Sequence, residues 1–293
     1  MALVYSGTAA VLALGAVVLA VYMATLSPTI AGGDSGELVA EGCILGTAHP
    51  PGYPLFTLLG YAISRYTYIK GLSEGSPAER VNASSALYTA LASVFMGLSV
   101  QIIAAFMSKD RGTSSNYHLS SHSSSSSSSS MSRRILWLKS LPGVIFTMFM
   151  FAFSPLIWQY AVTAEVFPLN TLFASLLLYL VLEFAANHKK TVVLLGSFVS
   201  GLALCNQHTI VLFEAPLIMW MLVLLRSQLI AKRDIVFALQ IGASFLAGLV
   251  PYLDLPLTGN LNPTMGSWGE LSTAEGLLHH VLRRDYGTFQ LFR

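Results

Sequence analysis

Two acidic residues in this sequence stand where a carboxylate could do chemistry. Asp34 and Glu37 lie three residues apart in the sequence Gly-Asp-Ser-Gly-Glu, and both would share one face of a helix that starts near Ser35. A carboxylate placed just outside an apolar run could act as a general base toward a substrate hydroxyl. The structural alternative is a capping box, with Asp34 as the helix N-cap and Glu37 as its partner.

A second reactive candidate is His49, in the sequence His-Pro-Pro-Gly-Tyr-Pro at residues 49–54. Paired prolines fix the backbone, so His49 and Tyr53 would stand at a rigid turn. A purely structural turn is the alternative. Glu165 opens a later apolar run, where its carboxylate could contact a substrate or could simply stabilise the helix dipole.

Two further polar residues, Asn206 and His208, interrupt the apolar sequence in Cys-Asn-Gln-His-Thr at residues 205–209. They are candidate substrate contacts, or members of a hydrogen-bonded cluster at a helical hairpin. The spacings His-x-x-x-His and Cys-x-x-Cys do not occur, so no metal site is predicted. Two free thiols are favoured over a disulfide between Cys43 and Cys205.

Three arginines could bind a phosphate through charge-assisted hydrogen bonds. These are Arg80, Arg283 and Arg284, which fall on the same side of the predicted membrane as the acidic candidates. Contact with lipid headgroups is the alternative role for all three.

The composition places these residues in a membrane protein. Apolar residues make up 54% of the 293 and charged residues 10%, against about 25% charged in soluble domains. The mean hydropathy is +0.64. With a net charge of +2 and no basic stripe interleaved with aromatic residues, nucleic-acid binding is not expected.

Apolar runs predict an all-α multi-pass protein with about seven transmembrane helices, since one crossing takes about 20 residues. A short apolar segment at 53–66 ends in Arg65 and is predicted to be an interfacial helix on the membrane surface. The predicted spans are 7–26, 83–107, 135–153, 166–185, 191–204, 210–225 and 235–253.

The spans divide the chain into four parts. Residues 1–107 hold two spans and a loop at 29–80 with the acidic candidates, and 108–134 form a serine-rich loop expected to be disordered. Five spans follow in 135–255, and 256–293 form a C-terminal segment. A cytoplasmic N-terminus places the basic interior loops in the cytoplasm and the acidic candidates on the opposite side, although Arg65 and Arg80 also fall there.

Six segments, taken together, resemble a known family. They are Gly-Gly-Asp-Ser-Gly-Glu-Leu at 32–38, Ala-His-Pro-Pro-Gly-Tyr-Pro-Leu-Phe at 48–56, Arg-Val-Asn at 80–82, Ala-Glu-Val-Phe at 164–167, Cys-Asn-Gln-His-Thr at 205–209 and Tyr-Gly-Thr-Phe at 286–289. In order and across nearly the whole chain, they resemble the transmembrane protein 260 family of protein O-mannosyltransferases, within the GT-C superfamily of membrane glycosyltransferases.

The resemblance implies a GT-C-like helical bundle in the endoplasmic reticulum membrane, with lumenal interfacial helices and a lumenal active site. It implies dolichyl phosphate mannose as donor and Ser or Thr hydroxyls of protein domains, such as the IPT domains of plexin-like receptors, as acceptors. No cofactor or metal ion is expected. Asp34 matches the catalytic aspartate of the family's first loop.

The remaining roles are assigned more loosely within that mechanism. Sugar or acceptor contacts are expected from Glu37, His49, Tyr53, Glu165, Asn206 and His208. Contacts to the lipid phosphate are expected from Arg80, Arg283 and Arg284. Family members usually continue with further spans and a soluble repeat domain, so the chain is expected to be a fragment, a short isoform or a reduced relative.

Two functions from other classes compete with the enzyme. A transporter or lipid-handling protein also places acidic residues in the membrane, but near its middle and often in two related halves. A non-catalytic scaffold would keep the shape of the glycosyltransferase and lack turnover. The position of the polar residues at one membrane face favours the enzyme.

Overall fold

The computed structural model describes residues 7–66, 75–115, 126–226, 234–261 and 266–284, and within these ranges the chain forms helices and turns without a strand. In chain order the elements are α2 (Thr8–Ala24), α3 (Ser35–Ile44), α4 (Pro54–Tyr66), α5 (Pro77–Ser115), α6 (Ser126–Ala152), α7 (Pro155–Ala161), α8 (Val166–Asn187), α9 (Lys190–Leu204), η2 (His208–Ile210), α10 (Val211–Arg226), α11 (Ile235–Gly248), η4 (Val250–Leu253), α12 (Asp254–Leu261) and α13 (Ala274–Val281). The predicted all-helical class is therefore confirmed.

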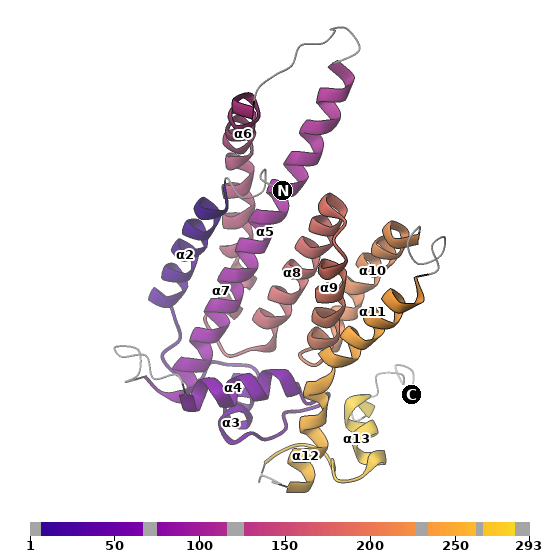
Figure 1. The fold of residues 1–293 in the computed structure, drawn as a ribbon. Coiled ribbons are helices and arrows are strands. Elements are labelled where there is room, and N and C mark those ends of the chain that lie inside the picture. Colours follow the sequence, from indigo (N-terminus) through magenta and orange to yellow (C-terminus); the bar gives the residue numbers. More distant parts are fainter. Residues whose placement is uncertain (1–6, 67–74, 116–125, 227–233, 262–265, 285–293) are drawn as a thin grey trace, which may run out of the picture.

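The long helices form a bundle, and short helices lie across one end of it. In Figure 1 the helices α3, α4, α12 and α13 occupy the lower end, beneath α5, α8 and α9. The bundle is held by contacts of α5 with α2, α6 and α8, and of α9 with α8 and α11. The lower layer is joined to it where α4 contacts α5 and η4.

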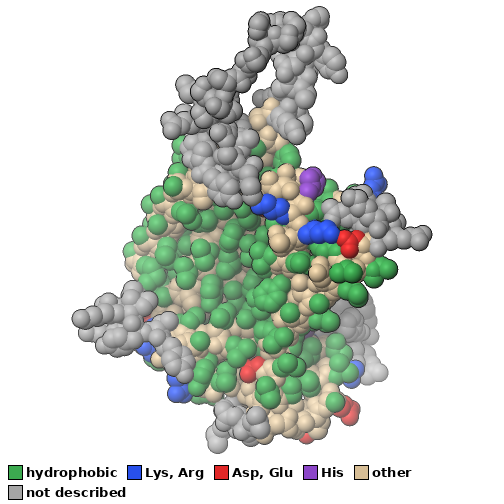
Figure 2. Space-filling model, viewed as in Figure 1, with side chains coloured by type: hydrophobic (Ala, Val, Ile, Leu, Met, Phe, Trp, Pro, Cys, Tyr) green, Lys and Arg blue, Asp and Glu red, His purple; other side chains and the backbone are tan. Residues whose placement is uncertain are grey.

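The outer surface of the bundle is apolar, as expected for a protein in lipid. Figure 2 shows a broad hydrophobic band across the middle of the face in view, with most Lys, Arg, Asp and Glu side chains above and below it. Leu212 is 79% exposed and Leu239 is 69% exposed, an arrangement that is costly in water and favourable in a bilayer. The predicted membrane class follows from this surface.

Fewer helices meet the criteria of length and composition for a membrane crossing than the predicted seven. Three helices are long and apolar enough to cross a membrane, in α5, in α8 and in the continuous stretch His208–Arg226, among the described residues. Two bent helix pairs raise the number to five, while α2 and α9 are shorter apolar helices. Seven crossings and the GT-C fold therefore stay predictions.

The serine-rich segment lies between α5 and α6. Both helices extend into the range 108–134 that was predicted to be disordered, since α5 ends at Ser115 and α6 begins at Ser126. Residues 116–125 of this segment fall outside the described ranges, and so does the Tyr-Gly-Thr-Phe sequence at 286–289.

A close contact between α9 and α11 positions the polar turn at 205–209. A Cβ atom added to Gly201 would lie 2.2 Å from the carbonyl oxygen of Phe245 and 3.1 Å from the Cα atom of Gly248. Only glycine therefore fits at this contact. This packing brings η4 beside the end of α9, where the Tyr252 hydroxyl donates to the Leu204 carbonyl at 2.8 Å.

Candidate active site

Asp34 stands exposed at the start of α3. Gly33 precedes it with φ of +75°, a backbone conformation that favours glycine, and Asp34 occupies the N-cap position without a capping hydrogen bond from its side chain. The side chain is 58% exposed. Asp34 therefore holds the N-cap position that the capping-box alternative gave it, but its side chain makes no capping hydrogen bond. The carboxylate faces the solvent at the lower end of the bundle.

Glu37 holds His49 in place beside this carboxylate. One oxygen of Glu37 accepts the backbone N–H of His49 at 2.6 Å, and the His49 Nδ1 atom lies 3.1 Å from the other oxygen. The Nε2 atom lies 3.0 Å from the Tyr53 hydroxyl and 3.8 Å from Asp34 Oδ2. These distances suit the tautomer in which Nδ1–H donates to Glu37 and Nε2 accepts from Tyr53.

Glu165 is a buried carboxyl directly behind Asp34. It precedes α8 without capping it, is 6% exposed, and accepts a hydrogen bond from the Asp34 backbone. Burial raises the pKa of Glu165 to about 7, and the negative charge of Asp34 acts in the same direction. Glu165 therefore holds the backbone of Asp34 in place through this hydrogen bond. Its role is not limited to stabilising the dipole of α8.

The raised pKa predicts that stability decreases as pH rises. The folded chain holds the Glu165 proton up to about pH 7, whereas the unfolded chain releases it near 4.5. Stability is therefore lost between these pH values, by at most about 3 kcal/mol and by less where solvent screens the charge. Thermal unfolding of the detergent-solubilised chain at pH 5 and pH 8 should show a decrease to which other buried acids such as Glu41 also contribute. Glu165→Gln should remove the Glu165 part of it, and an equal decrease in both proteins would contradict the assignment.

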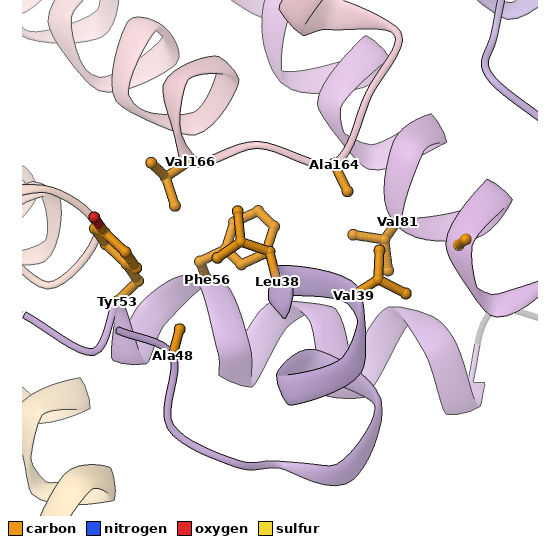
Figure 3. Packing of buried hydrophobic residues seen from close by; sticks show 9 residues of the cluster. Leu38, Val39, Ala48, Tyr53, Phe56, Val81, Ala164 and Val166 are labelled. Carbon is orange, nitrogen blue, oxygen red and sulfur yellow. The ribbon is translucent and has the colours of Figure 1, made fainter. Parts of the chain in front are cut away.

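A small hydrophobic core fixes these elements relative to one another. Figure 3 shows Leu38 of α3 and the ring of Phe56 of α4 between these helices and the segment that carries Ala164 and Val166. The buried cluster consists of Leu38, Val39, Ala48, Tyr53, Phe56, Ala78, Val81, Ala164 and Val166. Because four separate segments share this core, Asp34, His49 and Glu165 lie together although they are far apart in sequence.

Asn206 and His208 lie farther along the same end of the bundle. Asn206 is fully buried, and its amide donates to the Val166 carbonyl at 3.0 Å, which ties the turn to the segment that follows Glu165. The His208 ring contacts the Tyr252 hydroxyl. The hydrogen-bonded cluster anticipated as the alternative is present, and direct substrate contact by these two residues stays a prediction.

The three candidate arginines do not form one phosphate site. Arg80 lies in the first turn of α5 and is half-buried, whereas Arg283 follows α13 and lies close enough to His208 for their charges to interact. Arg284 beside it is exposed. The start of α5 and α13 lie at opposite sides of the lower layer in Figure 1, so Arg80 and Arg283 would meet different parts of a substrate.

Sequence reasoning missed a second polar group in this layer. Glu41 is 4% exposed and accepts a hydrogen bond from the Ser267 hydroxyl at 2.7 Å. Burial raises the pKa of Glu41, and the charge of Glu37 adds to the effect. Glu41 follows Glu37 by four residues, the spacing of one helix face, and this was the available signal.

A cavity with both polar and apolar lining adjoins Ser267, the partner of Glu41. It measures about 270 Å³ and is lined in part by Thr47, Ser267 and Trp268. The Trp268 ring lies 6.5 Å from the His49 ring in an edge-to-face arrangement, so the cavity opens next to the site. Within the described ranges, no group of three or more His, Cys, Asp or Glu side chains could hold a metal ion.

Comparison with known proteins gives consistent matches. The family model described as the protein O-mannosyl-transferase TMEM260 N-terminal domain matches residues 34–231. Protein O-mannosyl-transferase TMEM260 of Mus musculus is 36% identical over 282 residues, which cover 94% of this chain and 34% of that protein. The Dictyostelium discoideum protein of the same name is 32% identical over 289 residues, covering 93% of this chain and 30% of its own length.

The chain thus spans about a third of the length of these relatives. No solved structure matches the chain significantly. The resemblance found from six short segments is confirmed by the matches over nearly the whole sequence. Since the family model covers more than half of the chain, the chain belongs to the protein O-mannosyl-transferase TMEM260 family.

Proposed function

We propose that this chain is a membrane protein O-mannosyltransferase that uses Asp34 as its general base. The observation that supports it is the exposed Asp34 carboxylate, 3.8 Å from His49 and backed by the buried Glu165. The two relatives are both named protein O-mannosyl-transferases, and the acceptor of such an enzyme is a protein hydroxyl.

The reaction would be a direct displacement at the sugar C1 atom. The hydroxyl oxygen of an acceptor Ser or Thr forms a bond to C1 while the bond from C1 to the lipid phosphate breaks, which inverts the anomeric centre. Asp34 takes the hydroxyl proton, and the phosphate leaves with both electrons of the broken bond. A carboxylate near the attacking oxygen and positive charge near the leaving phosphate lower the barrier for this charge flow.

Different residues around Asp34 would bind different parts of the substrates. Glu37, Tyr53 and His49 form a connected hydrogen-bonded group that can meet sugar or acceptor hydroxyls. The start of α5, which carries Arg80, and α13, which precedes Arg283, lie at opposite sides of the lower layer. The lipid phosphate would therefore bind near one of these two arginines and not near both. Arg283, with His208 and Arg284 nearby, is the better candidate, because two arginines lie together there.

The donor and location follow the resemblance. We infer dolichyl phosphate mannose as the donor, a GT-C-like bundle of seven crossings in the endoplasmic reticulum membrane, a cytoplasmic N-terminus and a lumenal site. The gathering of α3, α4, α12 and α13 at one end of the bundle (Figure 1) supports one part of this inference, a site on a single side of the membrane.

The direct test is transfer of labelled mannose from dolichyl phosphate mannose to a purified IPT domain by the detergent-solubilised chain. The expected result is label on the domain, and none on a domain whose Ser and Thr acceptors are replaced by Ala. Dolichyl phosphate glucose, offered in parallel, tests the sugar. Absence of transfer with every donor would contradict the proposal and favour a non-catalytic scaffold.

A further inference from the structure

A groove in the apolar bundle lies away from the proposed active site. It measures about 410 Å³ and is bounded by α8, α9, α10 and α11, a volume within the range of about 300–1,000 Å³ typical of ligand pockets. Its walls are mainly leucine, valine and isoleucine side chains. Two glycines, Gly196 and Gly242, also line it, and a Cβ atom on either would have no neighbour within 4 Å.

One acidic side chain interrupts this apolar lining. Glu214 is 2% exposed, lines the groove, and its Oε1 atom has no hydrogen-bond partner among the described residues. The nearby Ser197 hydroxyl already donates to the Ile241 carbonyl at 2.8 Å. A buried carboxyl oxygen without a donor is costly, so a ligand with a donor would relieve that cost.

The groove runs along α10 and opens to the apolar outer surface of the bundle. Its lining on α10 extends from Glu214 to Leu225, a length of about 16 Å at 1.5 Å per residue. Glu214 lies in the first turn of α10, toward the end that bears the active site. Two lining residues, Ile218 and Leu222, are 45% and 48% exposed, so a lipid could enter from the bilayer.

We propose that this groove binds a membrane lipid with a long apolar body and a single hydroxyl group, which donates to Glu214. The hydroxyl supplies the missing donor, and the apolar body fills the space beside Gly196 and Gly242. A phosphate headgroup would instead place an anion beside a carboxyl group, which disfavours phospholipids and lipid phosphates. The shared chemistry fits either a sterol or a linear long-chain alcohol. The site is separate from the proposed transfer reaction and does not depend on it.

The test is photolabelling of the full 293-residue chain in phosphatidylcholine nanodiscs. Two probes, a diazirine-bearing sterol and a diazirine-bearing long-chain alcohol, distinguish the two kinds of lipid, and each is competed with its unmodified parent. Gly196→Leu on α9 and Gly242→Leu on α11 add bulk at two lining positions where a Cβ atom has no neighbour within 4 Å. Ala243→Leu adds the same bulk at an exposed position that does not line it.

We expect competable labelling by at least one probe, with the cross-link on groove residues. Each glycine variant should lower it about tenfold, and Ala243→Leu should leave it unchanged. Glu214→Leu should lower it about fivefold, the ratio that one hydrogen bond typically gives, whereas Glu214→Gln keeps an acceptor and most of the labelling. Thermal unfolding of each variant checks that it is folded. Equal labelling of the parent and both folded glycine variants would overturn the proposal, as would competition by phosphatidic acid equal to that by the alcohol.

Discussion

Replacing Asp34 with asparagine should reduce mannose transfer by about 10²- to 10⁴-fold, the usual contribution of a general base. Asparagine keeps the size and hydrogen-bonding shape of the side chain and removes its ability to take the acceptor proton. Because the Asp34 side chain is 58% exposed and does not cap α3, the fold should be unaffected. The measurement is the initial rate of transfer from dolichyl phosphate mannose at saturating donor and acceptor.

The matched control is Glu275→Gln, which neutralises an exposed carboxylate in the first turn of α13, in the same layer. Its rate should equal that of the parent. Equal thermal unfolding of parent and Asp34→Asn separates a chemical effect from a folding defect. A variant that transfers mannose at the parental rate would exclude Asp34 as the base and turn attention to Glu37 or Glu165.

The helices could be predicted from the sequence because lipid imposes a simple rule. A run of apolar residues must satisfy its own backbone hydrogen bonds, and a helix does so locally. The predicted span at 166–185 thus corresponds to α8 at Val166–Asn187, and the predicted interfacial helix to α4 at Pro54–Tyr66. The number of crossings is harder to predict from the sequence. The helix pair formed by α11 and by η4 with α12 is apolar enough to count as one span, yet it bends by 45° at the break.

The partners within the site could not be predicted, because they depend on packing between distant segments. Glu165 lies behind Asp34 since the segment before α8 shares a core with α3 and α4, and no pattern in the sequence records that contact. Ser267 and Trp268 reach Glu41 and His49 from the C-terminal segment for the same reason. Residue types indicated what chemistry was available, and the tertiary fold determined which groups meet.

His49 should be the second most sensitive position, and we expect His49→Ala to reduce transfer up to about a hundredfold. Its ring lies between Glu37, Tyr53 and Asp34. Loss of the ring leaves the Glu37 carboxylate and the Tyr53 hydroxyl without this partner, so a substrate bound by either group would shift. The exposed His279 of α13 provides the matched control, since His279→Ala removes a histidine from the same layer outside this group. Parental activity in His49→Ala would show that the connection between Glu37 and Tyr53 has no part in transfer.

A double-mutant cycle decides whether His49 acts through Glu37. Both groups are joined by contacts of 2.6 and 3.1 Å, and residues that act as one unit have non-additive effects. Glu37→Gln should therefore cause much of the loss seen in His49→Ala, and the double variant should be little worse than His49→Ala alone. Additive losses would mean that each side chain contacts the substrate separately.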